Sequence, residues 1–412
     1  MPLSMEQNNF KVYGYRWIML FAFMLAVAVN QLLWITFAAI TGEAATFYHV
    51  NDLSIGLFSL SFLIVYIIVS IPASWVIDTY GIRVAVGIGA TLTGIFGLSR
   101  GILASDYTLV LVAQIGIAVG QPFILNAVTA LAARWFPIRE RATAAGLGSL
   151  AIYLGIIAGL ALTPYLTIRS GIGGMLMLYG VIAAAAVVTF FLLARERPPT
   201  PPGPPDQQAR SLVFDGLVQI LRKRDFVLLL FIFFIGLGLF NAVTTWIEDI
   251  LRPRQFSGAQ AGIIGGVMVL GGVVGALVIP ELSDRLRRRV PFLILALAGS
   301  VPGLIGITFA TDFTLLLVSA FILGFFLLSA GPVGFQYGAE VGYPAPEGTS
   351  NGLILLAGQI SGIAFIFGMD TFRASDAAMT PSLIVLTGLM VLCLLLATRL
   401  NESPLLTSNT SG

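Results

Sequence analysis

The stretch WIMLFAFMLAVAVNQLLWITFAAI at residues 17–40 decides the fold class, because it contains no charged side chain. An α-helix needs about 20 consecutive apolar residues to cross a bilayer, and this run exceeds that length. It lacks the short apolar core and the small-residue cleavage site of a secretory leader. We therefore expect it to form the first of several membrane-spanning helices.

The composition of the whole chain extends this expectation beyond one segment. Hydrophobic residues make up 57% of the 412 positions and charged residues only 10%, with a mean hydropathy of +0.95. A soluble domain carries about 25% charged residues, so the apolar surplus must face lipid. The single cysteine, Cys393, excludes an intrachain disulfide, and the single histidine, His49, excludes a site built from two histidines.

Apolar runs of similar length recur along the chain and predict an all-α polytopic membrane protein with twelve spans in two six-helix halves. We expect the first half at residues 1–194, a cytoplasmic linker at 195–224 and the second half at 225–412. The expected spans are residues 15–41, 54–77, 82–104, 107–133, 141–167, 173–194, 226–251, 259–282, 290–310, 313–338, 348–372 and 379–399.

The linker differs in composition from the segments around it. Residues 198–205 are proline-rich, which predicts an extended spacer without a core of its own. Residues 211–224 alternate apolar and polar positions, which predicts a short amphipathic helix at the membrane surface.

Basic residues are distributed unevenly between the two sides of the expected membrane. With the N-terminus inside, 17 Lys and Arg residues lie on the inner side and 5 on the outer side. Cytoplasmic loops carry the excess of basic residues, so both termini are expected in the cytoplasm. The interpretation is a multi-pass protein of the cell (inner) membrane.

Two weak repeats relate the halves. Pro137-Ile138-Arg139-Glu140 resembles Pro344-Ala345-Pro346-Glu347, and Asp78 near the end of span 2 resembles Asp284 near the end of span 8. Repeats of about half the chain are expected for a transporter built from two parallel halves.

The loop after the second span, Asp78-Thr79-Tyr80-Gly81-Ile82-Arg83, resembles the inner-loop signature of the major facilitator superfamily. An acid that closes one helix can accept from donors on a neighbouring helix, and glycine permits the tight turn between them. A charge latch is therefore predicted, with positive-inside topology alone as the alternative explanation. Its residues would be Asp78, Gly81, Arg83, Glu140, Arg141, Asp284, Arg285 and Glu347.

Several stretches resemble the feline leukaemia virus subgroup C receptor family, a branch of this superfamily. The most specific runs from Gly331 to Ser350 and includes Gly-Phe-Gln-Tyr-Gly-Ala-Glu and Glu-Gly-Thr-Ser. Residues 30–35, 121–125 and 359–363 resemble further motifs of that family. The resemblance implies the superfamily's fold and transport of choline or ethanolamine, with haem export as a further association of the family.

Neutral polar residues near the expected midplane are the candidate substrate ligands. Asn30 and Trp34 share a face of the first span, as do Asn241 and Thr245 in the seventh. Interhelical hydrogen bonding is the alternative role for the amides. The family resemblance implies a site built around Trp34, Gln121 and Gln359, with Asn241 where the family has a tyrosine. Trp246 or Phe240 could replace that missing aromatic wall. The candidate set is Trp34, Asn30, Gln121, Asn241, Thr245 and Gln359.

No carboxylate is expected at the bilayer midplane, which favours facilitated diffusion over strong proton coupling. Glu43 and Asp370, close to the outer rim, are the candidates for coupling from a wet vestibule.

These patterns predict a secondary transporter that moves a small organic solute, a choline-like cation or zwitterion, by alternating access. The alternative is an exporter of amphipathic compounds such as haem, lipids or drugs, with or without proton coupling. No catalytic residues, metal site or cofactor are predicted, so we expect no enzyme activity. The expected partners are the solute and the lipid bilayer, without nucleic acid, and the expected state is a monomer.

Overall fold

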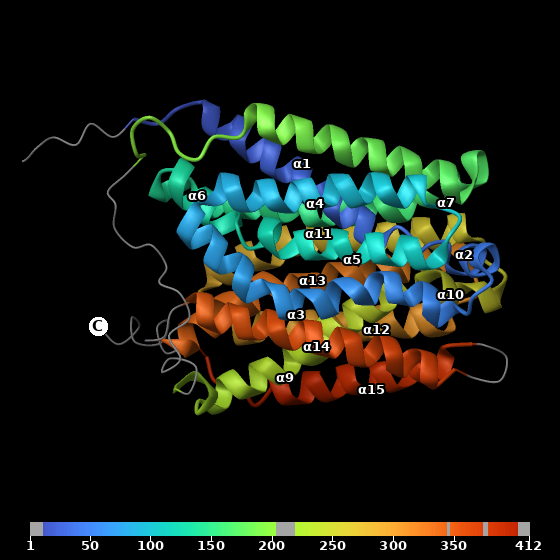
Figure 1. Ribbon diagram of the computed structural model, residues 1–412. Coiled ribbons are helices and arrows are strands. Elements are labelled where there is room, and N and C mark those ends of the chain that lie inside the picture. The colour runs from blue at the N-terminus through green and yellow to red at the C-terminus, as the bar shows by residue number, and fades with distance from the viewer. Residues whose placement is uncertain (1–10, 203–218, 344–346, 374–377, 403–412) are drawn as a thin grey trace, which may run out of the picture.

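The computed structural model describes residues 11–202, 219–343, 347–373 and 378–402, and over these ranges the regular structure is helical. Long apolar helices are joined by short connections (Figure 1). The first half contains α1 (Tyr15–Ile35), α2 (Thr41–Tyr48), α3 (Asp52–Tyr80), α4 (Ile82–Ile102), α5 (Tyr107–Leu125), α6 (Val128–Trp135) and α7 (Ile138–Leu193). The second contains α9 (Arg224–Thr245), α10 (Ile247–Leu251), η1 (Arg252–Arg254), α11 (Gly258–Leu286), α12 (Val290–Phe309), α13 (Phe313–Gly342), α14 (Glu347–Thr371) and α15 (Thr380–Ala397).

Eleven helical segments of the described chain are long and apolar enough to cross a membrane, and one of them accounts for two crossings. The segment Thr143–Leu193 has 51 residues, about 77 Å of helix, more than twice the thickness of a bilayer core. Gly171 interrupts it at φ 68°, a left-handed conformation that glycine adopts without steric cost. The hydroxyls of Thr163 and Tyr179 lie 2.9 Å apart, so the chain reverses direction there. The predicted twelve-span architecture is therefore confirmed.

Two capped helix starts repeat between the halves at a spacing of 206 positions. Asn51 caps α3 by accepting from Ser54 N–H, and Ser257 caps α11 by accepting from Gln260 N–H. Asp106 caps α5 and Asp312 caps α13 in the same way. A cap satisfies one backbone donor that the first helical turn leaves free. The predicted repeat thus recurs in the local chemistry of equivalent helices.

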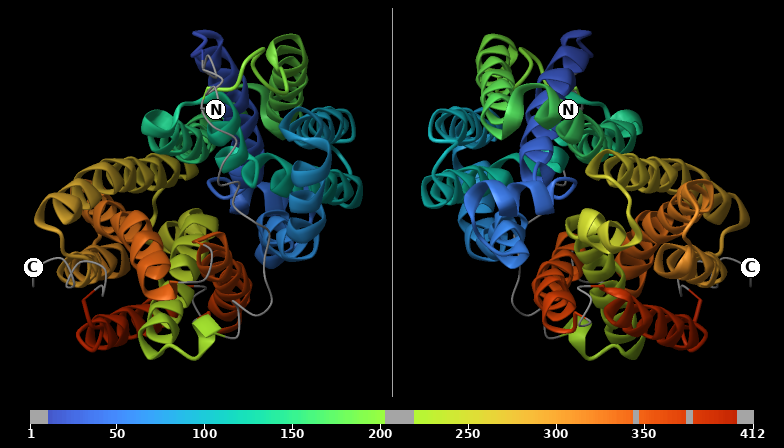
Figure 2. Two further views of the ribbon diagram at one scale, coloured as in Figure 1. Left: turned by 90° about the vertical axis from the view of Figure 1, so that its left-hand side faces the viewer. Right: turned by 90° about the vertical axis from the view of Figure 1, so that its right-hand side faces the viewer.

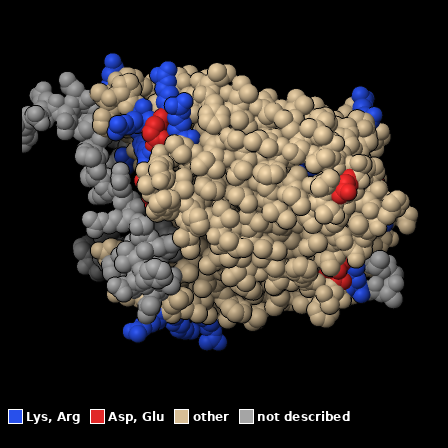
Figure 3. Space-filling model, viewed as in Figure 1, with Lys and Arg blue, Asp and Glu red and all other residues tan. Residues whose placement is uncertain are grey.

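Viewed roughly along the helices, the two halves lie side by side, the first half coloured blue to green and the second yellow-green to red (Figure 2). Helix α7 packs against α11, and α3 packs against α14, and these are the most extensive helix contacts between the halves. On the face seen in Figure 3, charged side chains lie mostly near the two ends and leave an uncharged belt between them. This distribution is expected if the helices run across the bilayer, with the uncharged belt facing the lipid tails and the charged ends facing water.

The halves approach closely at the end that contains α2, α10 and η1, which we call the closed end and which lies on the right of Figure 1. A Cβ added at Gly262 would lie 2.1 Å from the Leu160 carbonyl oxygen, so α11 and α7 touch backbone to backbone. Gly56 of α3 packs on the Trp246 ring in a similar way. In the described part of the chain, every hydrogen bond or ion pair between the halves lies at this end.

The opposite end, which we call the latch end, contains Gly81, Glu196, Arg289 and Glu402. The expected amphipathic helix at 211–224 lies mostly outside the described residues, although positions 219–221 are helical. The partition into residues 1–194, 195–224 and 225–412 stays a prediction.

Candidate functional site

Trp34 lies in the last turn of α1 and is only 5% exposed. Its indole Nε1–H donates to the Ser59 carbonyl of α3 at 3.2 Å. The ring is therefore fixed against α3, and its orientation is set inside the first half. A rigid indole of this kind presents a π-face without carrying a charge.

Asn30, one turn before Trp34, has its side chain fully engaged in the protein. It is 0% exposed, its Nδ2–H donates to Thr93 Oγ1 of α4 at 3.1 Å, and its Oδ1 accepts from Gln31 Nε2–H at 3.3 Å. Asn30 thus joins α1 to α4 by a hydrogen bond, which is the alternative role expected for a polar amide in a membrane helix.

The other four candidate ligands, by contrast, form no side-chain hydrogen bond with the described residues. Gln121 of α5 is 7% exposed, and Thr245 at the end of α9 has a buried Oγ1 without a partner. Asn241 and Gln359 are half-buried in α9 and α14. Buried polar groups in membrane proteins normally find partners, so these four are available to a ligand or to water.

A chain of contacts links Trp34 to Asn241 across the halves. A Cβ added at Gly362 of α14 would lie 2.9 Å from Asn241 Nδ2 and 3.2 Å from Leu63 Cδ1. Leu63 is one helical turn from Ser59, the residue that accepts from Trp34. Helices α1, α3, α9 and α14 therefore meet at this level.

The aromatic side chain that could replace the family's tyrosine is engaged elsewhere. Trp246 is 0% exposed, and its Nε1–H donates to the Ile366 carbonyl at 3.1 Å. The Arg373 guanidinium lies 5.1 Å from its ring centre, and Gly56 packs on the ring's far edge. Trp246 is thus part of the seal at the closed end, whereas Phe240 is half-buried beside Asn241.

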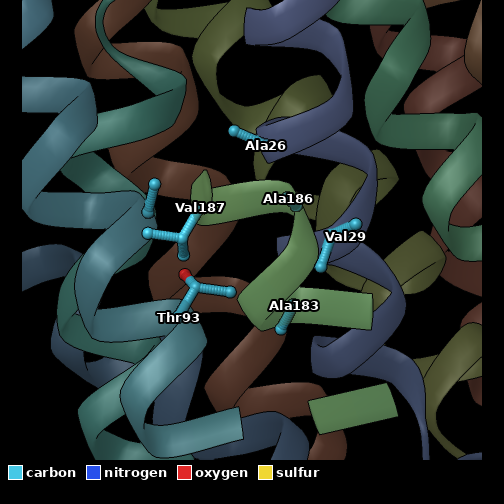
Figure 4. Close-up of a pocket in the computed structure, with 7 residues that line it drawn as sticks. Ala26, Val29, Thr93, Ala183, Ala186 and Val187 are labelled. Carbon is cyan, nitrogen blue, oxygen red and sulfur yellow. The ribbon is translucent and has the colours of Figure 1, made fainter. Parts of the chain in front are cut away.

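A small crevice between α1, α4 and the second part of α7 is lined almost entirely by apolar side chains, unlike the candidate substrate site (Figure 4). Its free space is too narrow to admit a water molecule. Its one hydroxyl, on Thr93, already donates to the Gly89 carbonyl and accepts from Asn30. The lining offers little for recognition of a polar solute and consists of Ala26, Val29, Ala90, Thr93, Ala183, Ala186 and Val187.

At the latch end, the helix that follows the predicted loop motif, α4, is capped by a residue that the sequence did not single out. Gly81 has φ 92°, and the Glu196 carboxylate accepts from the N–H groups of Ile82 at 3.2 Å and Arg83 at 2.7 Å. Glu196 also forms an ion pair with Arg134. Glu196 follows the sixth span, so its position over this turn depends on how the helices pack.

The remaining latch candidates of the first half have other partners or none. Asp78 is exposed and forms no ion pair or hydrogen bond with the described residues. Glu140 pairs with Arg16 of α1 at 3.0 Å. Arg141 donates to the Phe136 carbonyl at 3.2 Å. In this conformation these contacts stay within the first half.

The second half forms its own charge network at the latch end. Arg289 contacts Asp284 and also Glu340, the latter at 3.1 Å. Arg285 instead pairs with Glu281 at 2.9 Å along α11. The side chain of Glu347 lies outside the described residues.

The closed end holds a second charge network, which we call the closed-end cluster. It comprises Asp52 of α3 from the first half and Glu248, Asp249, Arg252, Asp370 and Arg373 from the second. Asp52 accepts from Arg252 at 2.6 Å and from Arg373 at 3.1 Å, and these are the ion pairs that join the halves in the described chain. Arg373 also holds Asp370 at 2.8 Å.

Two carboxyls of the cluster are deeply buried. Burial raises the pKa of Glu248, while Arg252 and the Gly42 N–H, which donates at 3.0 Å, oppose that rise. Burial and the charge of Asp52 hold the pKa of Asp249 well above its ordinary value, against the influence of Arg252 and Arg373. Of the two coupling candidates, Asp370 belongs to the cluster and Glu43 is exposed at its edge.

A twelve-helix bundle with two halves that meet at one end has the architecture of membrane transporters, and comparison with known proteins decides the family. The model of the Major Facilitator Superfamily matches residues 16–366. The chain belongs to the Major Facilitator Superfamily.

Relatives within this superfamily are similar over most of their length. Solute carrier family 49 member A3 of Xenopus tropicalis is 32% identical over 395 residues, which is 92% of this chain and 82% of the relative. The choline/ethanolamine transporter flvcr2b of Danio rerio is 26% identical over 401 residues, covering 92% and 83%. The expected resemblance to the feline leukaemia virus subgroup C receptor family is thereby confirmed.

A solved structure has the same fold. A bacterial homologue of the human lysosomal transporter Spinster, in an inward-facing and unoccupied conformation, aligns with a TM-score of 0.72 at 16% identity. The alignment covers 95% of this chain and 98% of that one. This likeness confirms the fold, and the family match over residues 16–366 makes the chain a multi-pass membrane transporter.

Proposed function

We propose that this superfamily transporter moves a small organic cation or zwitterion of the choline or ethanolamine type by alternating access. The solute would bind between the halves, with Trp34 on one side and Gln121, Asn241, Thr245 and Gln359 supplying polar contacts. Asn30 would act indirectly by fixing the helix that carries Trp34.

The observation that carries this proposal is the set of polar groups left without protein partners. Gln121, Asn241, Thr245 and Gln359 are neutral, so they can orient a hydroxyl or an amine without the cost of burying a charge. The face of a tryptophan attracts a quaternary ammonium by about 0.5–2 kcal/mol. This combination suits a polar solute that carries its own positive charge.

The relatives support the same class of solute. Proteins named as choline/ethanolamine transporters are 25–29% identical over most of this chain. Asn241, where the family has a tyrosine, leaves a less aromatic site, so we expect ethanolamine-like amines to bind at least as well as choline.

The contact pattern supports alternating access. The halves touch at the closed end, while hydrogen bonds and ion pairs described at the latch end stay within one half. With the predicted orientation, the closed end would face outside and the solute would reach the site from the cytoplasm. Transport would then require separation of Asp52 from Arg252 and Arg373.

Uptake into proteoliposomes tests the proposal. Radiolabelled choline and ethanolamine should enter vesicles that contain the protein faster than protein-free vesicles, with and without a proton gradient. Equal uptake in both vesicle types for all amines tested would exclude the proposed solute class. Thermal stabilisation by haem, lipids or drugs, with none by amines, would instead support export of amphipathic compounds.

A further inference from the structure

The closed-end cluster contains more acid than base. Four carboxyls, those of Asp52, Glu248, Asp249 and Asp370, face two guanidiniums, those of Arg252 and Arg373. Glu43 adds a further negative charge at the edge. With every group ionised, the interface would hold uncompensated negative charge away from water, which is unfavourable.

Asp249 is the fully buried carboxyl of the cluster, and one of its two oxygens, Oδ2, lacks a donor in the described chain. Its Oδ1 shares Arg252 and Arg373 with Asp52, which lies across the interface. A buried carboxylate oxygen without a donor is costly, whereas a protonated oxygen removes the charge.

The other carboxyls of the cluster are less buried than Asp249, and among the described residues none of them has a buried oxygen without a partner. Asp52 receives two guanidinium donors, Asp370 is held by Arg373, and Glu248 accepts from the Gly42 N–H. Glu43 is exposed to water. The excess negative charge is therefore most readily removed at Asp249.

We propose that Asp249 is a proton-binding site that is loaded when the closed end shuts and emptied when it opens. On closing, the Asp249 carboxylate takes one proton from water to form a neutral acid. On opening, Asp52 leaves with the first half, water reaches Asp249, and the proton returns to solvent. The interface between the halves is thus linked to pH, in addition to the proposed movement of an organic solute.

The sign of the linkage follows from the two states. In the closed state the pKa of Asp249 is raised well above its ordinary value, and in water an aspartate has a pKa of about 3.9. Between these values the closed state binds more protons than the open state. Lowering the pH through this window therefore favours closure, and the closed-to-open ratio rises by up to about tenfold per pH unit for one proton.

The distance between the halves at the closed end can be measured without knowing the solute. Ser105 and Thr311 are exposed, lie in equivalent connections of the two halves at the closed end, and can each be replaced by a spin-labelled cysteine. The native Cys393 is buried and is replaced by alanine in the same background. Double electron–electron resonance on the full chain in nanodiscs then gives the populations of short and long distances.

In this background, acidification should shift the population towards the short distance. Asp249→Asn, which is neutral at every pH, should stay mostly closed and lose the pH dependence. Asp52→Asn removes the neighbouring negative charge and should move the midpoint to lower pH. The matched control Glu281→Gln, an exposed carboxylate at the latch end, should keep the original profile.

Either of two results would overturn the proposal. The first is a distance distribution that does not change with pH in the background protein, a result that needs no cluster variant to fold. The second is an Asp249→Asn variant that keeps the original pH profile, which would assign the titration to another group. Both readouts are independent of solute uptake, so they also separate this proposal from the proposed function.

Discussion

Glu196 and Glu402 occupy equivalent positions in the two halves, and each carboxylate accepts from two backbone N–H groups at the start of a membrane helix. Glu196 binds the start of α4, and Glu402 accepts from Arg289 at 2.8 Å and Val290 at 3.4 Å at the start of α12. The two residues are separated by 206 positions, the spacing of the paired helix caps. An anion at a helix N-terminus is favoured by the free N–H groups and the helix dipole.

These contacts predict a stability loss on neutralisation. Glu196→Gln and Glu402→Gln should each cost about 1 kcal/mol and lower the apparent Tm, because an amide oxygen is a weaker acceptor than a carboxylate. Glu281→Gln, in an exposed pair along one helix, should cost at most about 0.5 kcal/mol. Thermal unfolding followed by tryptophan fluorescence in detergent compares the three, and equal losses would refute the capping role.

Gly262 should be required for closure of the two halves. Any side chain there would meet the Leu160 carbonyl at 2.1 Å, so Gly262→Ala should push α11 from α7 and favour the open state. Gly266, one turn along the same helix, has no atom within 4 Å of an added Cβ and provides the control. The spin-label distance between positions 105 and 311 should lengthen for Gly262→Ala and stay unchanged for Gly266→Ala.

Substitutions at Gln121 and Asn30 should distinguish a residue that binds the solute from one that stabilises the fold. Gln121→Leu removes an amide with no protein partner, so uptake should fall about tenfold while the apparent Tm is maintained. Asn30→Leu removes the bonds to Thr93 and Gln31, so it should cost about 1–3 kcal/mol of stability. Parallel uptake and unfolding measurements compare the two, and a large Tm loss for Gln121→Leu would show a structural role instead.

Trp34 should contribute through its aromatic face. Trp34→Leu should raise the KM for a quaternary amine by about two- to thirty-fold, because a cation–π contact contributes about 0.5–2 kcal/mol. Trp34→Phe keeps a ring but loses the hydrogen bond to Ser59, so it should retain part of the affinity. Saturation kinetics in proteoliposomes give the comparison, and equal KM values for all three proteins would remove Trp34 from the site.

Arg100 should be a structural residue of the first half. It is 0% exposed and donates to the Leu33 carbonyl, Gln114 Oε1 and Thr36 Oγ1, and none of its bonds with the described residues goes to a carboxylate. Arg100→Met keeps the volume but removes these donors, so we expect a loss of about 1–3 kcal/mol. Unfolding of this variant and of exposed Arg285→Met gives the test, and similar stability of the two would contradict it.

The membrane spans were predictable because an apolar run is a local property of the sequence. The expected span 82–104 corresponds to α4 at Ile82–Ile102, and 290–310 to α12 at Val290–Phe309. The expected span 15–41 was too long, since α1 ends at Ile35 and turns before α2. Residues 36–40 are as apolar as the helix they follow because they are buried at the closed end, so hydropathy alone could not mark the boundary.

Partners between distant side chains were not predictable in the same way. Asn30 and Trp34 share a helix face, yet one bonds to α4 and the other to α3. Nothing in the sequence around Glu196 indicated a capping role, since it is one charged residue among others at the start of the linker. It nevertheless caps α4, which begins more than 100 residues earlier in the chain. In each case the hydrogen-bond partner depends on how the helices pack against one another. That packing cannot be read from the sequence of a single segment. The burial of Glu248 and Asp249 likewise follows from contact between the halves.

The spacing of 206 positions between paired caps identifies equivalent residues in the two halves. At these caps the counterpart of a residue in the first half lies 206 places later, as Asn51 has Ser257 and Asp106 has Asp312. Each substitution can therefore be designed as one of a matched pair within a single polypeptide, under one lipid composition and one expression level. Where the members of a pair respond differently, the difference measures how far the two halves depart from equivalence.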